Sequence, residues 1–221
     1  LSIGPITVNT STVSSETGTS SSTSTGDIAQ YATSTSGLNL LSGAGLLNKC
    51  NETSSACQAK TLTREEAAAV VATIGGVSLD APNAYSDDDQ SIYQRAINSL
   101  PYYGNQICLG GGVQFQPTET VARDQFACLL IKSIKAGSTT EFSGSVDKYS
   151  DEGASSWTNE INILAANDLI PSCSSIQDKF CPSRNISVGE IAYMVDRMVS
   201  KSLISSDLFS NSIFQDGWTA N

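Results

Sequence analysis

The apolar residues between positions 121 and 134 fall on one face of a helix. Their spacing is close to the 3.6-residue period of an amphipathic α-helix, and they are Val121, Phe126, Ala127, Leu130, Ile131 and Ile134. Pro117 precedes this run. Proline fixes its own φ and disfavours helical backbone in the residue before it, so Gln116 is expected to be extended. The pattern predicts a rigid turn followed by a helix.

This pattern of turn and helix occurs three times. One further copy lies later in the chain, and its matching residues are Phe180, Pro182, Ile186, Ile191 and Ala192. The other lies earlier, and its matching residues are Leu62, Arg64 and Ala68. The two spacings between copies are nearly equal. Such a repeat is typical of stacked supersecondary units, none of which is expected to bury its apolar face alone.

Two of the three copies begin with a capping box, in which a hydroxyl and a carboxylate satisfy free backbone N–H groups at a helix start. The pairs are Thr63 with Glu66 and Ser187 with Glu190. The central copy has Ala122 and Gln125 at these positions, which is half of the box.

A first helix precedes each turn. Its apolar positions match at a constant offset between the second and third units: Tyr93, Ile97 and Leu100 correspond to Trp157, Ile161 and Leu164. In the first unit only residues 38–47 resemble it. We therefore predict a mainly α fold of three helix–loop–helix repeats over residues 27–80, 81–144 and 145–202. An arm, residues 1–26, and a tail, residues 203–221, flank them.

With its Tyr-x-Asp openings at Tyr85 and Tyr149, its Phe-x-Pro turns and its Leu62-Thr-Arg-Glu-Glu helix start, the chain resembles surface-layer homology (SLH) repeats. The resemblance covers residues 27–202. It implies a pseudo-threefold bundle that anchors proteins to cell-wall or envelope polysaccharide, with sugar bound between repeats and contacting the Arg at the start of each second helix.

The resemblance makes Arg64 and Arg123 the candidate polysaccharide-binding residues. Tyr93 and Trp157 could stack on a sugar ring, although a place in the core is the alternative for both. The third unit departs from the family pattern because Val188 stands where the Arg is expected.

The six cysteines fall at related positions in the repeats. Fifteen connectivities are possible, and the repeat favours one disulfide in each unit: Cys50–Cys57, Cys108–Cys128 and Cys173–Cys181. Free buried thiols are the alternative. A zinc site is disfavoured because the chain has neither His nor a Cys-x-x-Cys motif. Disulfides place a protein in an oxidising, extracellular compartment.

Both ends of the chain have the composition of interaction segments. Residues 1–13 can form one or two short strands, and every residue from 10 to 25 is Ser or Thr except Val13, Glu16 and Gly18. Such a segment buries little apolar surface by itself. The arm either folds back on its own domain or lies on a neighbouring copy, which its extended reach of about 85 Å permits. The tail is rich in apolar residues and is expected to pack on the core or on a partner.

Charge and composition exclude several function classes. The 12 basic and 22 acidic residues give a net charge of −10, which disfavours nucleic acid and anionic membranes as partners. No run of 18 apolar residues exists, so membrane insertion is not expected. The first residue is Leu rather than Met, which suggests a removed leader. Without His the usual base for a Ser or Cys nucleophile is missing, so we expect neither an enzyme nor a cofactor.

Two kinds of surface modification or ligand remain open. Sequons at Asn9, Asn51 and Asn185 permit N-glycosylation. The acidic openings of the second and third units could chelate Ca²⁺, although we favour capping of the following helices, and no metal site is predicted. These acidic residues are Asp87, Asp88, Asp89, Asp147, Asp151 and Glu152.

Two functions follow from these features. The first is a secreted structural subunit that assembles with copies of itself into a filament, tube or surface layer, because the repeats fill nearly the whole chain and both ends resemble interaction segments. The alternative is a module that anchors to envelope polysaccharide, as the family resemblance implies.

Overall fold

The protein is mainly helical, as predicted. The computed structural model describes residues 34–47, 54–100, 108–109, 112–137, 142–173 and 178–210, with the side chains of residues 135–137 excepted. These residues form eight α-helices, one 3-10 helix and three isolated β-bridges. The N-terminal arm with its expected strand and Asn9, and also Asn51, lie outside the described residues. The repeat boundaries stay a prediction.

Three long helices begin around one central point. They are α3 (Arg64–Gly75), α6 (Arg123–Gly137) and α8 (Val188–Ser200). Just before each start, a buried apolar residue takes part in a closed ring of backbone hydrogen bonds. The N–H of Leu62 donates to the carbonyl of Ile186 (3.0 Å), that of Ile186 to Val121 (2.9 Å), and that of Val121 back to Leu62 (3.1 Å). The ring fixes the three helix starts relative to one another.

A second set of backbone bonds joins the same three segments in the opposite direction. The first N–H groups of a helix have no partner inside the helix, and here the neighbouring segment supplies the acceptors. Arg64 N–H donates to the Glu119 carbonyl (2.7 Å), Arg123 N–H to that of Arg184 (2.9 Å), and Val188 N–H to that of Lys60 (2.8 Å). Both predicted capping boxes are present, at Thr63 and Ser187.

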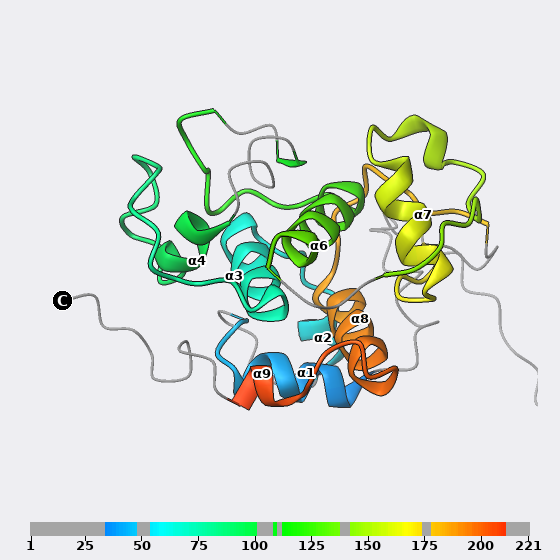
Figure 1. Cartoon of the computed structure of the whole chain (residues 1–221), viewed down its shortest axis with the longest axis horizontal. Helices are drawn as coiled ribbons and strands as arrows, with labels where there is room; N and C mark the ends of the chain where they lie inside the picture. Colours follow the sequence, from blue (N-terminus) through cyan, green and yellow to red (C-terminus); the bar gives the residue numbers. More distant parts are fainter. Residues whose placement is uncertain are drawn as a thin grey trace, which may run out of the picture.

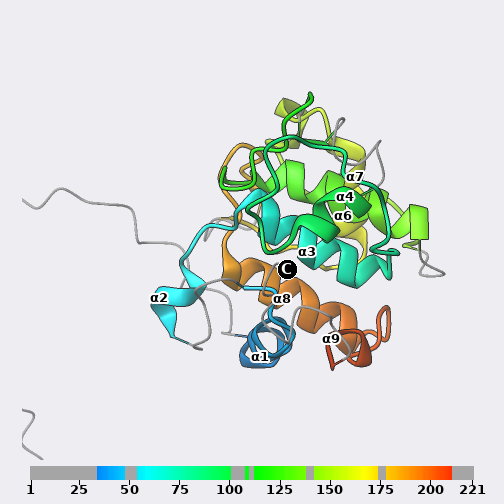
Figure 2. The same ribbon diagram turned by 90° about the vertical axis from the view of Figure 1, so that its left-hand side faces the viewer.

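Three shorter helices pack on the long ones, one on each (Figure 1). Helix α4 (Gln94–Ser99) packs on α3, α7 (Thr158–Ala166) packs on α6, and α1 (Thr35–Gly43) packs on α8. Because α1 is early in the chain and α8 is late, their contact closes the bundle, and Figure 2 shows α1 beneath α8. The smaller helices α2 (Ser55–Gln58), α9 (Asp207–Ser210) and η2 (Glu152–Ala154) contact α8, α1 and α7, respectively.

The beginning of the tail belongs to the core. Ile204 and Phe209 are 8% and 1% exposed, and α9 packs on α1 and α3. This part of the tail therefore packs on its own chain, one of the two outcomes expected for it. Residues 211–221 lie outside the described residues.

Two of the three predicted disulfides are present. Cys108 is bonded to Cys128 and Cys173 to Cys181, with Cα–Cα distances of 5.5 and 5.9 Å. Cys57 is also disulfide-bonded, whereas Cys50, its predicted partner, lies outside the described residues. The Cys173–Cys181 bond ties the segment that follows α7 to the turn that precedes α8.

The expectation that Gln116 would be extended is wrong. Gln116 has φ +59°, and Cys181 at the matching position has φ +55°. A carboxylate holds each turn in this left-handed conformation. Asp87 accepts from the N–H groups of Phe115 and Gln116 at 2.8 Å each, and Asp151 accepts from those of Phe180 and Cys181 at 2.7 and 2.9 Å.

These bonds also correct the expected role of the acidic openings. Asp87 and Asp151 cap the turns rather than the helices that follow them. The residues at the N-caps of α4 and α7 are Tyr93 and Trp157, and neither makes a side-chain capping bond. Each opening is therefore tied to the turn that precedes the second helix of the same unit.

Candidate functional site

The candidate polysaccharide sites lie where the start of one long helix meets the turn that precedes the next. We call them the α3, α6 and α8 junctions, after the helix that begins there. In the first two, an Arg side chain lies over the Phe ring of the turn. The guanidinium carbon of Arg64 is 5.3 Å from the centre of the Phe115 ring, and that of Arg123 is 4.7 Å from that of Phe180.

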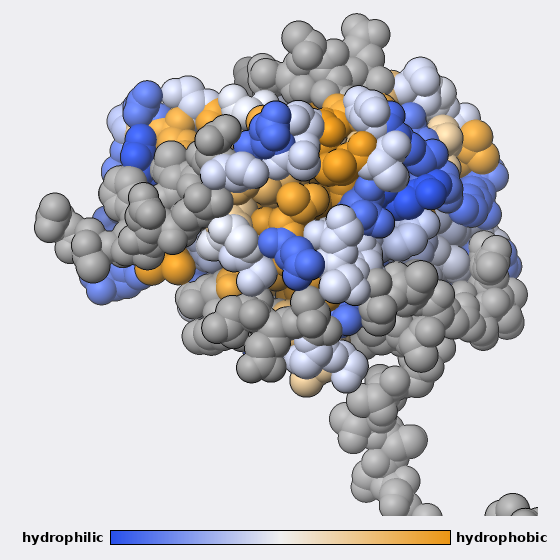
Figure 3. All heavy atoms as spheres, turned by 90° about the horizontal axis from the view of Figure 1, so that it is seen from below, coloured by the Kyte–Doolittle hydropathy of each residue, from blue (hydrophilic) through white to orange (hydrophobic). Residues whose placement is uncertain are grey.

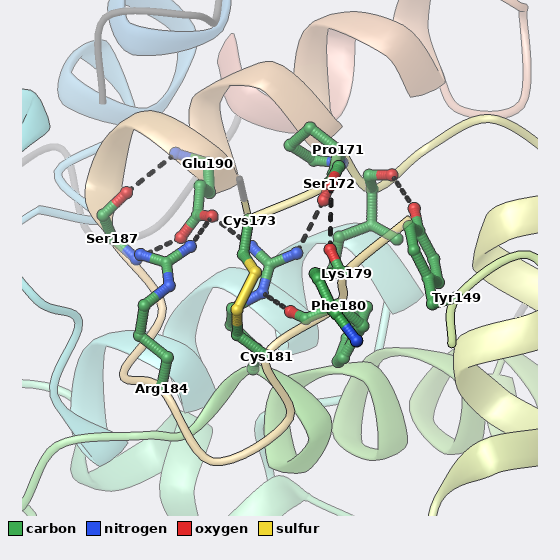
Figure 4. A network of polar contacts seen from close by, with 12 residues as sticks. Tyr149, Pro171, Ser172, Cys173, Lys179, Phe180, Cys181, Arg184, Ser187 and Glu190 are labelled. Atoms are coloured by element: carbon green, nitrogen blue, oxygen red, sulfur yellow. Dashed lines mark hydrogen bonds and ion pairs between the residues drawn. A yellow bond between two sulfur atoms is a disulfide. The ribbon is translucent and has the colours of Figure 1, made fainter. Parts of the chain in front are cut away.

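At the α6 junction every part of the Arg123 guanidinium has a partner. Nε donates to the Phe180 carbonyl (2.7 Å), Nη2 donates to the Pro171 carbonyl (2.6 Å), and Nη1 forms an ion pair with Glu190. Arg184 forms a second ion pair with the same Glu190 oxygen. Figure 4 shows Glu190 facing Arg184, with the Cys173–Cys181 disulfide nearby.

Arg123 is therefore not available to a ligand. Arg123 is 0% exposed and its partner Glu190 is 1% exposed. The prediction of Arg123 as a polysaccharide-binding residue is therefore wrong. The physical reason is that Glu190 has two functions. It completes the capping box through Oε2, which accepts from Ser187 N–H (2.9 Å), and it neutralises Arg123 through Oε1. The capping motif indicates the first function, whereas no local pattern indicates the second.

At the α3 junction Arg64 is buried with fewer partners. Nη1 donates to Gln116 Oε1 at 3.2 Å, whereas Nε and Nη2 are buried without a hydrogen-bond partner. The residue is 6% exposed. Burial lowers the pKa of Arg64, and the negative charges of Asp87 and Glu119 oppose this shift. A guanidinium stays protonated in proteins, so the α3 junction holds a positive charge with spare donors.

One substitution between repeats explains why the two Arg residues differ. The residue that matches Glu190 in the central unit is Gln125. Gln125 completes its half of the capping box, because its Oε1 accepts from Ala122 N–H at 3.0 Å. An amide carries no charge, so this position cannot give Arg64 the ion pair that Glu190 gives Arg123.

The α8 junction has no Arg and is closely packed. Val188 is 2% exposed at the position of the missing Arg. A Cβ atom on the next residue, Gly189, would lie 3.2 Å from both the carbonyl oxygen and Cβ of Gln58 in α2. Gly189 therefore lets α2 approach the start of α8 closely.

The two aromatic candidates differ in position. Tyr93 is 0% exposed and its hydroxyl donates to the Gly45 carbonyl at 2.9 Å, so its prediction as a sugar-stacking residue is wrong and the core alternative holds. Trp157 is partly buried against the core, and Lys132 Nζ lies 5.9 Å from its ring centre.

Three further predictions concern glycosylation, metal binding and membrane insertion. Asn185 is exposed, as an N-glycosylation acceptor must be. Among the described residues, no three His, Cys, Asp or Glu side chains gather so as to hold a metal ion. No helix in that part of the chain is long and apolar enough to cross a membrane.

Comparison with models of known protein families found no match to this chain. Comparison with curated proteins found none either. The SLH resemblance therefore rests on the motifs described above.

Proposed function

We propose that the protein is a secreted structural subunit that assembles with copies of itself outside the cell. The observation that carries the proposal is an apolar face on the closing side of the bundle. Figure 3 views the molecule from the side of α1 and α9 and shows hydrophobic residues gathered in the middle of this face. The partly buried apolar residues of these elements and of the neighbouring end of α8 are Leu40, Val199, Leu203 and Leu208.

The occupant that we propose for this apolar face is the N-terminal arm, residues 1–26, of a second copy. The arm contains Ile3, Ile6 and Val8 in a strand-forming pattern. Its Ser and Thr residues leave it without enough apolar surface to fold alone. Packing on the apolar face of a neighbouring copy would supply the contacts that the arm lacks. When an extended segment of one subunit packs on another subunit in this way, it joins the two subunits.

Two further features support a structural role outside the cell. Two disulfides and a closed ring of backbone hydrogen bonds stabilise the fold, and disulfides persist in oxidising compartments. Moreover, the α6 junction is filled by its own ion pairs and the α8 junction lacks the Arg. An anchor that used all three junctions is therefore disfavoured.

Sedimentation velocity tests the apolar face. We expect Leu40→Lys to shift the protein from polymer to monomer, because it places a charge on the contact surface. Asn39→Lys is the matched control, since Asn39 is exposed on the same helix and the change in charge is similar. Thermal melts of both variants check folding. Polymers that survive Leu40→Lys in a folded protein would contradict the proposed contact.

Arg64 favours the second candidate, a polysaccharide anchor. Its unpaired donors lie at the start of α3, where an anionic sugar substituent would be stabilised. If the anchor function holds, Arg64→Ala abolishes pelleting with cell-wall material. Arg95→Ala, which removes a partly exposed Arg paired with Asp80, leaves it unchanged. Equal pelleting of both variants would rule out this site.

A further inference from the structure

The sequon formed by Asn185, Ile186 and Ser187 lies at the start of α8, and its first and third residues have opposite surroundings. Asn185 is exposed, and its side-chain amide forms no hydrogen bond with any residue that the structure describes. Ser187 is 3% exposed. The amide that would carry a glycan is therefore accessible, whereas the hydroxyl that completes the sequon is not.

The Ser187 hydroxyl is held in the capping box of α8. Its Oγ accepts from Glu190 N–H at 3.3 Å, and Ser187 N–H donates to Glu190 Oε2 at 2.9 Å. Both residues are buried. The hydroxyl therefore becomes accessible only when the first turn of α8 opens.

Backbone hydrogen bonds fix the residues on either side of Asn185. The Arg184 carbonyl accepts from Arg123 N–H, and Ile186 N–H donates to the Val121 carbonyl, at 2.9 Å each. Ile186 is 0% exposed and belongs to the closed ring of backbone bonds described above. The sequon is thus part of the junction of the three long helices, and its backbone cannot rearrange while that junction is closed.

The repeats separate the role of Ser187 from that of Asn185. Ser187 matches Thr63, and both residues cap a long helix. Asn185 matches Thr61 and Thr120, which precede the ring residues of the other two copies. The hydroxyl of the sequon therefore has a structural role of its own. The Asn side chain forms no hydrogen bond that a modification would break.

We propose that Asn185 carries an N-linked glycan and that the glycan is attached before the start of α8 folds. The enzyme that attaches such a glycan binds the Asn amide and the hydroxyl of the third residue together. Only the unfolded segment presents both groups. Nδ2 of Asn185 forms a bond to the anomeric carbon of a sugar linked to a lipid diphosphate. The bond from that carbon to the diphosphate breaks, and Nδ2 releases one proton to a base of the enzyme.

A glycan at this position leaves the apolar face free. Asn185 precedes α8, whereas Val199 and Leu203 of the apolar face lie at the other end of this helix. Helix α8 has 13 residues, so its ends are about 20 Å apart. A glycan is bulky and solvated, so it would obstruct contact between copies on the apolar face itself, but at Asn185 it projects from the opposite end of α8.

Cell-free glycosylation with a purified oligosaccharyltransferase tests the order of events on the full chain. One sample is the native, disulfide-bonded protein, and the other is the reduced and alkylated chain, with its unfolding checked by circular dichroism. Mass spectrometry measures the glycan on the peptide that contains Asn185. We expect transfer to the native protein to be slower by about tenfold or more, because it must wait for local opening of the start of α8.

Two results of this experiment would overturn the proposal. The first is transfer to Asn185 at equal rates in the native and the unfolded chain, which would show that the closed junction does not protect the sequon. The second is an unfolded chain that is modified at Asn51 but not at Asn185, which would show that the enzyme does not accept this sequon.

Mass spectrometry of the full chain secreted from eukaryotic cells tests whether Asn185 is modified during synthesis. We expect one glycan at Asn185, its loss in Asn185→Gln with unchanged Tm, and its retention in Ser187→Thr, which keeps both the cap and the sequon. A folded, secreted protein without this glycan would overturn the proposal. The proposal rests on the location outside the cell that is part of the proposed function, but the mass of a single chain does not depend on assembly. A glycosylated protein that fails to assemble would therefore contradict only the proposed function.

Discussion

At the residue scale, a single side chain decides what an Arg at a helix start does. Arg123 and Arg64 occupy matching positions and lie over matching Phe rings, yet Arg123 is neutralised by Glu190 and Arg64 has two unpaired donors. The difference follows from Glu190 and Gln125 at one position of the repeat. The same pair of residue types, Arg and Phe, is therefore fully paired in one junction and keeps two buried, unpaired donors in the other.

Glu190→Gln should destabilise the protein by about 3–5 kcal/mol, because breaking a buried ion pair leaves an uncompensated buried charge on Arg123. Denaturant unfolding measures the change. The control is Asp168→Asn, which breaks a more exposed pair with Arg197 and should cost at most about 1 kcal/mol. A Glu190→Gln variant as stable as the control would show that the buried network contributes little.

The sequence places the two Arg residues at helix starts but cannot show their burial. The acceptors of Arg123 are carbonyls of Pro171 and Phe180, 48 and 57 residues later. Any residue type can supply a carbonyl, so no local pattern marks these contacts. Burial and the neighbouring Asp147 raise the pKa of Glu152 to about 7, and this shift escapes sequence reasoning for the same reason, since it depends on side chains brought together by the fold.

At the element scale, the sequence predicts a feature correctly where residues of the same helix or the same repeat determine it. The capping boxes at Thr63 and Ser187 follow from four-residue motifs, and two cysteine pairs follow from the repeat. The turn at Gln116 does not follow from its own residues, because Asp87, 29 residues earlier, holds its backbone in a conformation that the sequence pattern disfavours.

The closure of the bundle depends on a glycine at the crossing of α1 and α8. A Cβ atom on Gly37 would lie 1.9 Å from the Ala192 carbonyl oxygen. Gly37→Ala should therefore separate the two helices and destabilise the protein by about 1–3 kcal/mol, as overpacking does. Thermal or denaturant unfolding measures the loss.

Gly43 provides the matched control for this prediction. It lies in the same helix, and a Cβ atom there would have nothing within 4 Å. Gly43→Ala should be neutral or stabilising by up to about 1 kcal/mol, because Ala favours helix over Gly. If both alanine variants unfold alike, close packing at the crossing is not what holds α1 in place.

At the scale of the whole molecule, the described residues form a closed bundle with the arm attached to the helix that closes it. The arm precedes α1, which packs on α8, and the apolar face lies on the same side. An arm that engages the face of the next copy would therefore join subunits in a chain of identical contacts. Such a heterologous contact continues into a filament when the rotation between copies does not close.

Negative-stain electron microscopy of the full chain, beside a version that lacks residues 1–26, tests this account most directly. We expect ordered filaments, tubes or sheets from the full chain and dispersed particles from the truncated version, because the truncation removes the arm and keeps every residue of the described bundle. Circular dichroism checks that both are folded. Dispersed particles in both samples, or identical polymers in both, would contradict a structural subunit joined through its arm.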